Sequence, residues 1–324
     1  MGLLAVSALV LTACSSSEAG SIPGGSASAR TEASFARLID IGHGRKIYLE
    51  CRGSGSPTVV LVPGLVAAAD TWSYVKDSAG AMKPSGSAVY PRVGEFTRVC
   101  SYDRPGTARE SGGVTTSTSV PQPTTPRGDV ADLRAVLDTA GVGGPYVLAG
   151  WSAGGPVVRI FAAEHPHEVS GLVLVDAESE FLQSELTPAQ FDTFLALIRN
   201  DDSKRVAQWK DVERQNPEKV FDQVRAAPAA PRIPVVVLSG DTFDPAAFRA
   251  RLPAGAPAGF AQVFWRAQLA SQERLAEQYP DAEHITKTRS DHNIHNNRPQ
   301  LVVDAIHDVV EKVRGRQSGK PSPQ

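Results

Sequence analysis

The strongest constraint on the fold of this chain is a series of short runs that are almost continuously apolar and rich in β-branched residues. Such runs are typical of strands that are covered on both faces. They occupy residues 58–62, 98–102, 146–149, 172–175 and 235–238. Helical patterns lie among them, most clearly at 126–140 and 299–314. Strands that alternate with helices predict an α/β fold, with a mostly parallel sheet and helices on both faces.

Local signals mark where several of these elements begin and end. Strands are expected at 37–41 and 46–51, and the glycine-rich stretch 42–45 between them predicts a hairpin turn. Thr125 is placed as an N-cap before Pro126, which suits the first turn of a helix. Gly315 is expected to end the last helix.

One long segment interrupts the alternation. Residues 179–225 have no strand pattern but contain helical, charged sequence at 191–198, 204–214 and 217–225. The segment lies between two core strands and is longer than an ordinary crossover. It therefore predicts a helical cap, inserted at about residues 178–230.

The two ends of the chain differ in composition from the middle. Residues 2–13 are apolar and too short to span a bilayer, so 1–13 are predicted to be a signal peptide. They end in Leu-Thr-Ala-Cys, which resembles the lipobox of bacterial lipoproteins and implies lipidation of Cys14. Residues 14–30 are interpreted as a flexible tether and 317–324 as a disordered tail, which leaves 31–316 for the folded domain.

The net charge, the lipobox-like sequence and the number of cysteines limit where the protein can be located and what it can bind. The formal net charge is −2 and offers no basic field, which argues against a nucleic-acid partner. The lipobox resemblance implies export, with a lipid anchor on the outer side of a bacterial cell membrane, or secretion. Apart from Cys14, the chain contains an even pair, Cys51 and Cys100, in an oxidising compartment. Nothing in the sequence indicates an oligomeric state.

The pattern G-x-S-x-G occurs at Gly150–Gly154, with Ser152 at its centre. It follows the strand at 146–149 and precedes a helical run at 156–163, so the chain must turn sharply there. The two glycines remove side chains that would collide at such a turn. The turn would present the Ser152 hydroxyl above the sheet edge, where the Ala153 N–H can donate to a developing oxyanion.

With this motif in its context, the chain resembles the α/β-hydrolase superfamily from about residue 37 to 314, most closely its capped serine esterase and lipase-type members. The resemblance implies an eight-stranded sheet and a Ser-His-Asp triad, with no metal or organic cofactor. The sequence Val-Val-Leu-Val-Pro-Gly-Leu at 59–65 is similar to the strand that leads into the family's His-Gly turn. The match implies that the Leu65 amide is the second oxyanion donor, with Pro63 in place of the usual histidine.

Two further stretches carry the resemblance. Residues 102–106, Tyr-Asp-Arg-Pro-Gly, are similar to a family turn, and we interpret Asp103 and Arg104 as a structural ion pair that fixes it. Residues 289–299 resemble the family's histidine signature, although Asp291 replaces a glycine and Asn297 a glutamate. The spacing to Pro299 assigns His292 as the general base and leaves His295 as its rival.

The acid of the triad is open between two sites. Asp176 ends the strand at 172–175, where some family members carry the acid. Asp244 follows the strand at 235–238 but lies one residue beyond the family's usual position, and Asp241 lies two residues before it. Asp176 is only slightly preferred.

The family's strand order also makes the strand that ends at Cys51 a neighbour of the strand that holds Cys100. Neighbouring strands lie about 5 Å apart, which is within disulfide reach, and a Cys51–Cys100 bridge is predicted.

The predicted function is a serine hydrolase that cleaves a small-molecule carboxylic ester or acyl substrate through an acyl-enzyme. An amidase, aminopeptidase or lactonase on the same scaffold is the first alternative. A non-catalytic binding protein of the cell envelope is the second. Several apolar side chains either border the acyl pocket or pack in the core, namely Trp72, Trp151, Phe181, Phe191, Phe194, Leu195 and Leu197.

Overall fold

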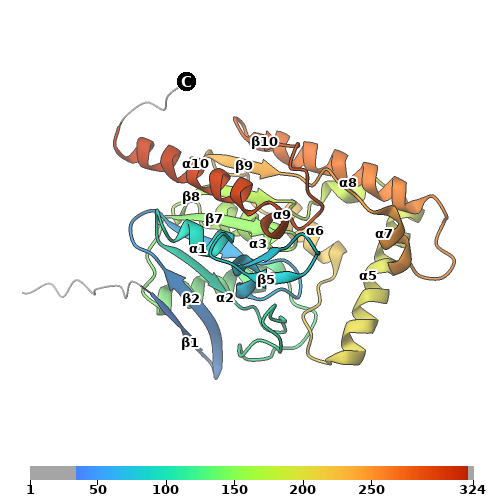
Figure 1. Cartoon of the computed structure of the whole chain (residues 1–324), viewed down its shortest axis with the longest axis horizontal. Helices are drawn as coiled ribbons and strands as arrows, with labels where there is room; N and C mark the ends of the chain where they lie inside the picture. The colour runs from blue at the N-terminus through green and yellow to red at the C-terminus, as the bar shows by residue number, and fades with distance from the viewer. Residues whose placement is uncertain (1–33, 320–324) are drawn as a thin grey trace, which may run out of the picture. The chain divides into compact units, whose positions relative to one another are not determined.

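The computed structural model describes residues 34–319 (Figure 1). The predicted signal peptide, the tether with Cys14 and residues 320–324 of the predicted tail lie outside the described residues. The last helix, α10 (Pro299–Gln317), continues through Gly315, so the expectation that Gly315 ends it is wrong, and it extends one residue past the boundary expected for the folded domain.

An eight-stranded sheet forms the centre of the molecule, in the order β1-β2-β6-β3-β7-β8-β9-β10. β1 and β2 run antiparallel, as do β2 and β6, and every other neighbouring pair is parallel. The fold class predicted from the sequence is therefore confirmed. The strands are β1 (Phe35–Gly42), β2 (Arg45–Arg52), β3 (Thr58–Val62), β6 (Val99–Tyr102), β7 (Tyr146–Trp151), β8 (Val169–Val175), β9 (Val235–Leu238) and β10 (Glu283–Ile285).

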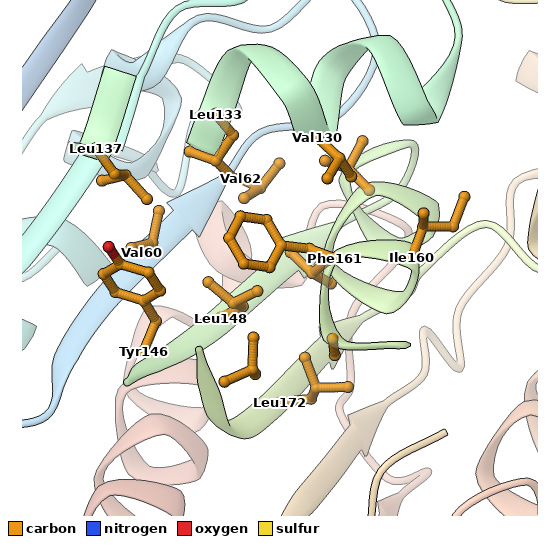
Figure 2. Packing of buried hydrophobic residues seen from close by; sticks show 14 of the residues in the cluster. Val60, Val62, Val130, Leu133, Leu137, Tyr146, Leu148, Ile160, Phe161 and Leu172 are labelled. Carbon is orange, nitrogen blue, oxygen red and sulfur yellow. The ribbon is translucent and has the colours of Figure 1, made fainter. Parts of the chain in front are cut away.

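Helices cover both faces of this sheet, which explains why its central strands are apolar throughout. Successive residues of a strand point to opposite faces. In β3, Val60 and Val62 belong to the core beneath α2 (Pro126–Thr139) and α3 (Gly154–Glu164). Figure 2 shows Val62 between Leu133 of α2 and Phe161 of α3, and Val60 beside Leu137 of α2. Val59 and Leu61 face the other side, where α1 (Val89–Val93) and α10 pack.

The segment between β8 and β9 leaves the sheet and returns to the neighbouring strand, as an inserted cap would. It contains α4 (Phe181–Ser184), α5 (Pro188–Gln208) and α6 (Pro217–Arg225). The helix expected at 204–214 is wrong beyond Gln208, where α5 ends. Residues 209–216, called here the return loop, are drawn off the helical path by contacts with the sheet domain, including the Glu213 N–H to the Gly106 carbonyl at 2.7 Å. Tertiary contacts here override helix propensity.

Two helices that the sequence analysis did not predict complete the helical layer. α7 (Pro245–Arg251) and α8 (Phe260–Glu277) follow β9 and pack against α5, and all three lie together at the right of Figure 1. Stacked rings join them, with Phe264 lying 5.7 Å from Phe194 and 4.7 Å from Phe248 between centroids. Phe191, Phe194, Leu195 and Leu197 are buried in this layer, so they pack the helices together.

The predicted disulfide is present. Cys51 of β2 and Cys100 of β6 stand directly opposite in the antiparallel ladder, with 4.0 Å between their Cα atoms. A small hairpin of β4 (Tyr74–Lys76) and β5 (Met82–Pro84) lies apart from the main sheet. Within residues 34–319, no helix combines the length and the apolar character needed to cross a bilayer.

Candidate active site

Ser152 occupies the sharp turn between β7 and α3. Its φ is 52°, in the left-handed region that non-glycine residues seldom adopt. The turn requires close backbone contacts, since a Cβ on Gly154 would lie 2.3 Å from the Val62 carbonyl oxygen. The Ser152 N–H donates to the Val175 carbonyl at 3.2 Å. The hydroxyl is therefore held at the end of the sheet where the parallel strands terminate.

A continuous chain of hydrogen bonds joins Ser152 to an acid. The Ser152 hydroxyl lies 2.9 Å from His292 Nε2, and His292 Nδ1 lies 2.6 Å from Asp176 Oδ2. The other Asp176 oxygen accepts the Gly240 N–H at 3.0 Å. Asp176 is buried and His292 is half-exposed. In the tautomer that this arrangement favours, Nδ1–H donates to the carboxylate and Nε2 accepts from the hydroxyl.

The other acids considered from the sequence lie elsewhere. Asp244 is the N-cap of α7 and accepts the N–H groups of Ala246 and Ala247, which lower the pKa of its carboxyl. Asp241 accepts the Ser290 N–H at 3.0 Å and so supports the loop that carries His292. Among the described residues, Asp176 is the one of these three carboxylates that contacts the His292 imidazole.

The His292 loop, between β10 and α9 (Ile294–Asn297), is fixed by side chains on both sides. Asn297 donates to Asp291 Oδ1 at 2.7 Å and to the Ser290 hydroxyl at 3.1 Å. The Trp151 indole donates to the His292 carbonyl at 2.9 Å. The two substitutions in the histidine signature thus contact each other and close the loop.

His295, the rival histidine, is fully buried. Its ring lies between the rings of Trp72 and Trp151, at 4.7 and 4.2 Å, and its Nε2 is 3.2 Å from the Thr71 hydroxyl. Burial lowers its pKa to about 3. Trp72 is itself fully buried, so it belongs to the core rather than to a pocket wall.

The loop that follows β3 lies against Ser152. A Cβ on Gly64 would meet the Trp151 ring at 2.8 Å and Ser152 Cβ at 3.1 Å. No hydrogen bond within residues 34–319 uses the N–H of Leu65 or of Ala153. Both predicted oxyanion donors are therefore free to donate to a ligand.

The predicted ion pair between Asp103 and Arg104 does not form, and this interpretation is wrong. Asp103 pairs with Arg109 at 2.5 Å and accepts the Ala69 N–H at 2.8 Å. Arg104 instead pairs with Glu213 of the return loop. Glu213 was not predicted from the sequence, because it lies 109 residues from Arg104, inside a stretch expected to be helical.

A second acid that the sequence analysis did not single out lies near His292. Burial raises the pKa of Glu178 to about 7, while the nearby His292 lowers it. No hydrogen bond or ion pair of its carboxylate is recorded within the described part of the chain, and its backbone N–H donates to the Ser152 carbonyl at 2.9 Å. Nowhere in residues 34–319 are three His, Cys, Asp or Glu side chains grouped so that they could hold a metal ion.

A mostly parallel eight-stranded sheet with a serine at a tight strand-to-helix turn defines the hydrolase class of α/β proteins. The chain belongs to the α/β-hydrolase fold family, whose profile matches residues 57–308. Among curated proteins, YqjL of Bacillus subtilis, which is uncharacterised, is 24% identical over 263 residues, or 80% of this chain and 85% of that protein. An uncharacterised Schizosaccharomyces pombe protein is 34% identical over 170 residues, which is 48% of this chain but only 30% of that longer protein.

Solved structures share the fold at low sequence identity. A bromoperoxidase from Bacillus anthracis has a TM-score of 0.55 at 18% identity and covers 86% of this chain and all of its own. A thermophilic esterase from Thermogutta terrifontis has a TM-score of 0.55 at 18% identity, and the match covers 86% of this chain and 99% of the esterase. Est816, described as an N-acyl homoserine lactone degrading enzyme, has a TM-score of 0.56 at 17% identity, and the match covers 85% of this chain and 100% of Est816. These similarities establish the fold alone.

Proposed function

We propose that the protein is a serine hydrolase that cleaves carboxylic esters, with Ser152 as nucleophile, His292 as general base and Asp176 as the acid that orients it. The observation that carries this proposal is the unbroken hydrogen-bond chain from the Ser152 hydroxyl through the imidazole to the buried Asp176 carboxylate. A serine hydroxyl is a weak nucleophile at neutral pH, and an adjacent imidazole activates it by taking its proton.

The proposed reaction has two halves. As the Ser152 oxygen attacks the acyl carbon, His292 Nε2 takes its proton, and Asp176 stabilises the resulting imidazolium. The free amides of Leu65 and Ala153 would donate to the oxyanion, each contributing roughly 3 kcal/mol to the barrier reduction. The imidazolium then gives its proton to the departing alcohol, and water hydrolyses the acyl-enzyme by the same steps. Amides and lactones would react through the same groups, so they remain the alternative substrates.

The first test is labelling of the folded domain by a fluorophosphonate, followed by intact mass. We expect one adduct on the wild type and none on Ser152→Ala, whereas Ser184→Ala, on the exposed surface of α4, labels normally. A panel of p-nitrophenyl esters, anilides and lactones would then rank the substrates. Absence of an adduct on folded wild-type protein would contradict the proposal and favour the non-catalytic binding protein.

We also propose export and anchoring through lipidated Cys14, on the strength of the Leu-Thr-Ala-Cys sequence at 11–14. Full-length protein expressed in a bacterium with an alkyne fatty acid should take up the label, and Cys14→Ser should not. A label retained by Cys14→Ser would refute the anchor.

A further inference from the structure

We propose that Glu213, on the return loop of the cap segment, is a positioning residue for the oxyanion hole, acting through Arg104 on the peptide that carries the Leu65 N–H. The inference rests on the proposed function, because it concerns the same site. It links two parts of the chain that are far apart in sequence, the loop after β3 and the segment between α5 and α6.

The geometry begins with the oxyanion loop, residues 63–66. Arg104 donates from Nη1 to the Pro63 carbonyl at 2.8 Å and from Nη2 to the Gly64 carbonyl at 2.7 Å. The Gly64 carbonyl and the Leu65 N–H are the two ends of one planar trans peptide unit, so they point in opposite directions. An arginine that fixes the carbonyl on the buried side therefore directs the Leu65 N–H to the other side.

Glu213 fixes the next peptide. Its Oε2 accepts the Val66 N–H at 2.6 Å. Val66 has a φ of 67°, which is an outlier for a β-branched residue and is kept only where surrounding contacts enforce it. The charge-assisted bond from the carboxylate is such a contact. Leu65 thus lies between two peptides that are each held by one member of the ion pair.

Glu213 is itself immobilised. It is fully buried, and its Oε1 lies 2.5 Å from Arg104 Nε while its Oε2 lies 3.1 Å from Nη2. Its backbone N–H donates to the Gly106 carbonyl, and a Cβ on Gly106 would lie only 2.6 Å from the Glu213 nitrogen. A glycine at 106 is therefore required for the return loop to approach the turn after β6.

The substitution Glu213→Gln tests this arrangement with little change of shape. A glutamine amide group presents N–H donors where the carboxylate accepted, so it faces either the Val66 N–H or the guanidinium with the wrong polarity. Loss of a single oxyanion donor lowers kcat by roughly a hundred- to a thousandfold, and loosening one donor should cost part of that. We expect kcat for p-nitrophenyl acetate to fall by about ten- to a hundredfold, with KM within threefold of the wild type.

The matched control is Glu180→Gln. Glu180 also pairs with a buried arginine, Arg159, but no recorded contact within the described residues links either side chain to the oxyanion loop. Urea unfolding of both variants would measure their losses of stability. Affinity for a boronic acid, whose tetrahedral adduct places an oxygen in the oxyanion hole, would measure the hole directly. We expect Glu213→Gln to weaken boronic acid binding by the same factor as kcat, and Glu180→Gln to leave both within threefold.

Equal effects of the two variants on kcat, or a Glu213→Gln effect confined to stability or to KM, would overturn the inference. If Glu213→Gln does not fold, Arg104→Lys decides by the same readouts, because lysine keeps the charge beside Glu213 but lacks the fork that holds two carbonyls. Failure of wild-type protein to react with the fluorophosphonate would instead reject the proposed function itself. The two failures are therefore distinguishable.

Discussion

Residues 34–319 contain two buried arginine–glutamate pairs whose surroundings differ. In Arg104–Glu213 and in Arg159–Glu180, the side chains of both partners are at most 5% exposed. The remaining donors of Arg104 go to backbone carbonyls of the oxyanion loop. Arg159, on α3, donates instead to the side chain of Gln278 at 2.6 Å, just after α8. The first pair fixes a loop at the candidate active site, and the second joins helices.

The two pairs also differ in the charges near them. Beside Arg104–Glu213 lies a third buried group, Asp129, whose pKa burial raises to about 8 despite the attraction of Arg104. The neighbours of Arg159–Glu180 are the neutral side chains of Gln278 and Tyr279. Burial alone would raise the pKa of Glu180, but Arg159 and the hydrogen bonds from its other neighbours, including Gln278, together outweigh burial and lower it. Although the two pairs are similarly buried, the cluster around Arg104–Glu213 contains one additional acidic group, whereas the acid and the base of Arg159–Glu180 are equal in number.

The largest expected effect comes from removing either arginine. Arg104→Met and Arg159→Met each leave a buried carboxylate without its partner, which costs about 3–5 kcal/mol of stability. Urea unfolding at neutral pH would measure both losses. A loss below about 1 kcal/mol at either site would show that water reaches that glutamate after the arginine is removed, and the two pairs would no longer be comparable.

A smaller effect, found only at the first pair, concerns pH. A carboxyl with a pKa of about 8 when folded and about 3.9 when unfolded keeps its proton longer in the folded state. Stability contributed by this group is therefore present at low pH and is lost as pH rises from about 4 to about 8, by at most about 1.4 kcal/mol per pH unit. Asp129→Asn removes this loss. The free energy of unfolding of the variant, measured relative to the wild type, should therefore increase as pH rises through that window.

Urea unfolding at several pH values would measure the Asp129→Asn effect. Asp308→Asn, on an exposed part of α10, serves as the control and should track the wild type. A constant difference between Asp129→Asn and wild type across the window would contradict the expected protonation of Asp129.

The smallest expected effect involves Glu178, two residues before Glu180 on the same segment. Glu180 is paired, whereas Glu178 interacts electrostatically with His292. Burial raises the pKa of Glu178 to about 7, so the folded state keeps this proton to a higher pH than the unfolded chain does. Stability contributed by this group is therefore lost as pH rises from about 4 to about 7, and Glu178→Gln should gain stability relative to the wild type over that window. Urea unfolding at several pH values would measure the gain, and a constant difference from the wild type would contradict the expectation.

How far the sequence predicted the molecule depended on whether the determining contacts were local. The apolar strands and the Ser152 turn were predictable because their residues act on their immediate neighbours. β10 has only three residues, none of them buried, and so carries no apolar run. α8 did carry a signal, since Phe260, Phe264 and Ala267 recur at helical spacing. Glu213 carried none, because an ion pair across 109 residues leaves no local pattern.

The candidate acid illustrates the same limit. Asp176 and Asp244 both follow parallel strands, and the ends of those strands meet at one edge of the sheet. Sequence spacing could not separate them, because the choice depends on which side chain faces His292 and which caps a helix. The structure supplies that distinction through the Gly240 N–H, which holds Asp176 in place, and the first turn of α7, which engages Asp244.

The contact between Glu213 and the oxyanion loop has a consequence for how such a protein can diversify. A cap that touched the sheet domain only through apolar side chains could be exchanged as a module to alter substrate choice. Here a graft that replaced residues 209–216 would leave Arg104 charged and buried, with Val66 unpaired. Positions 104 and 213 must therefore change together, whereas α7 and α8 lie outside that linkage.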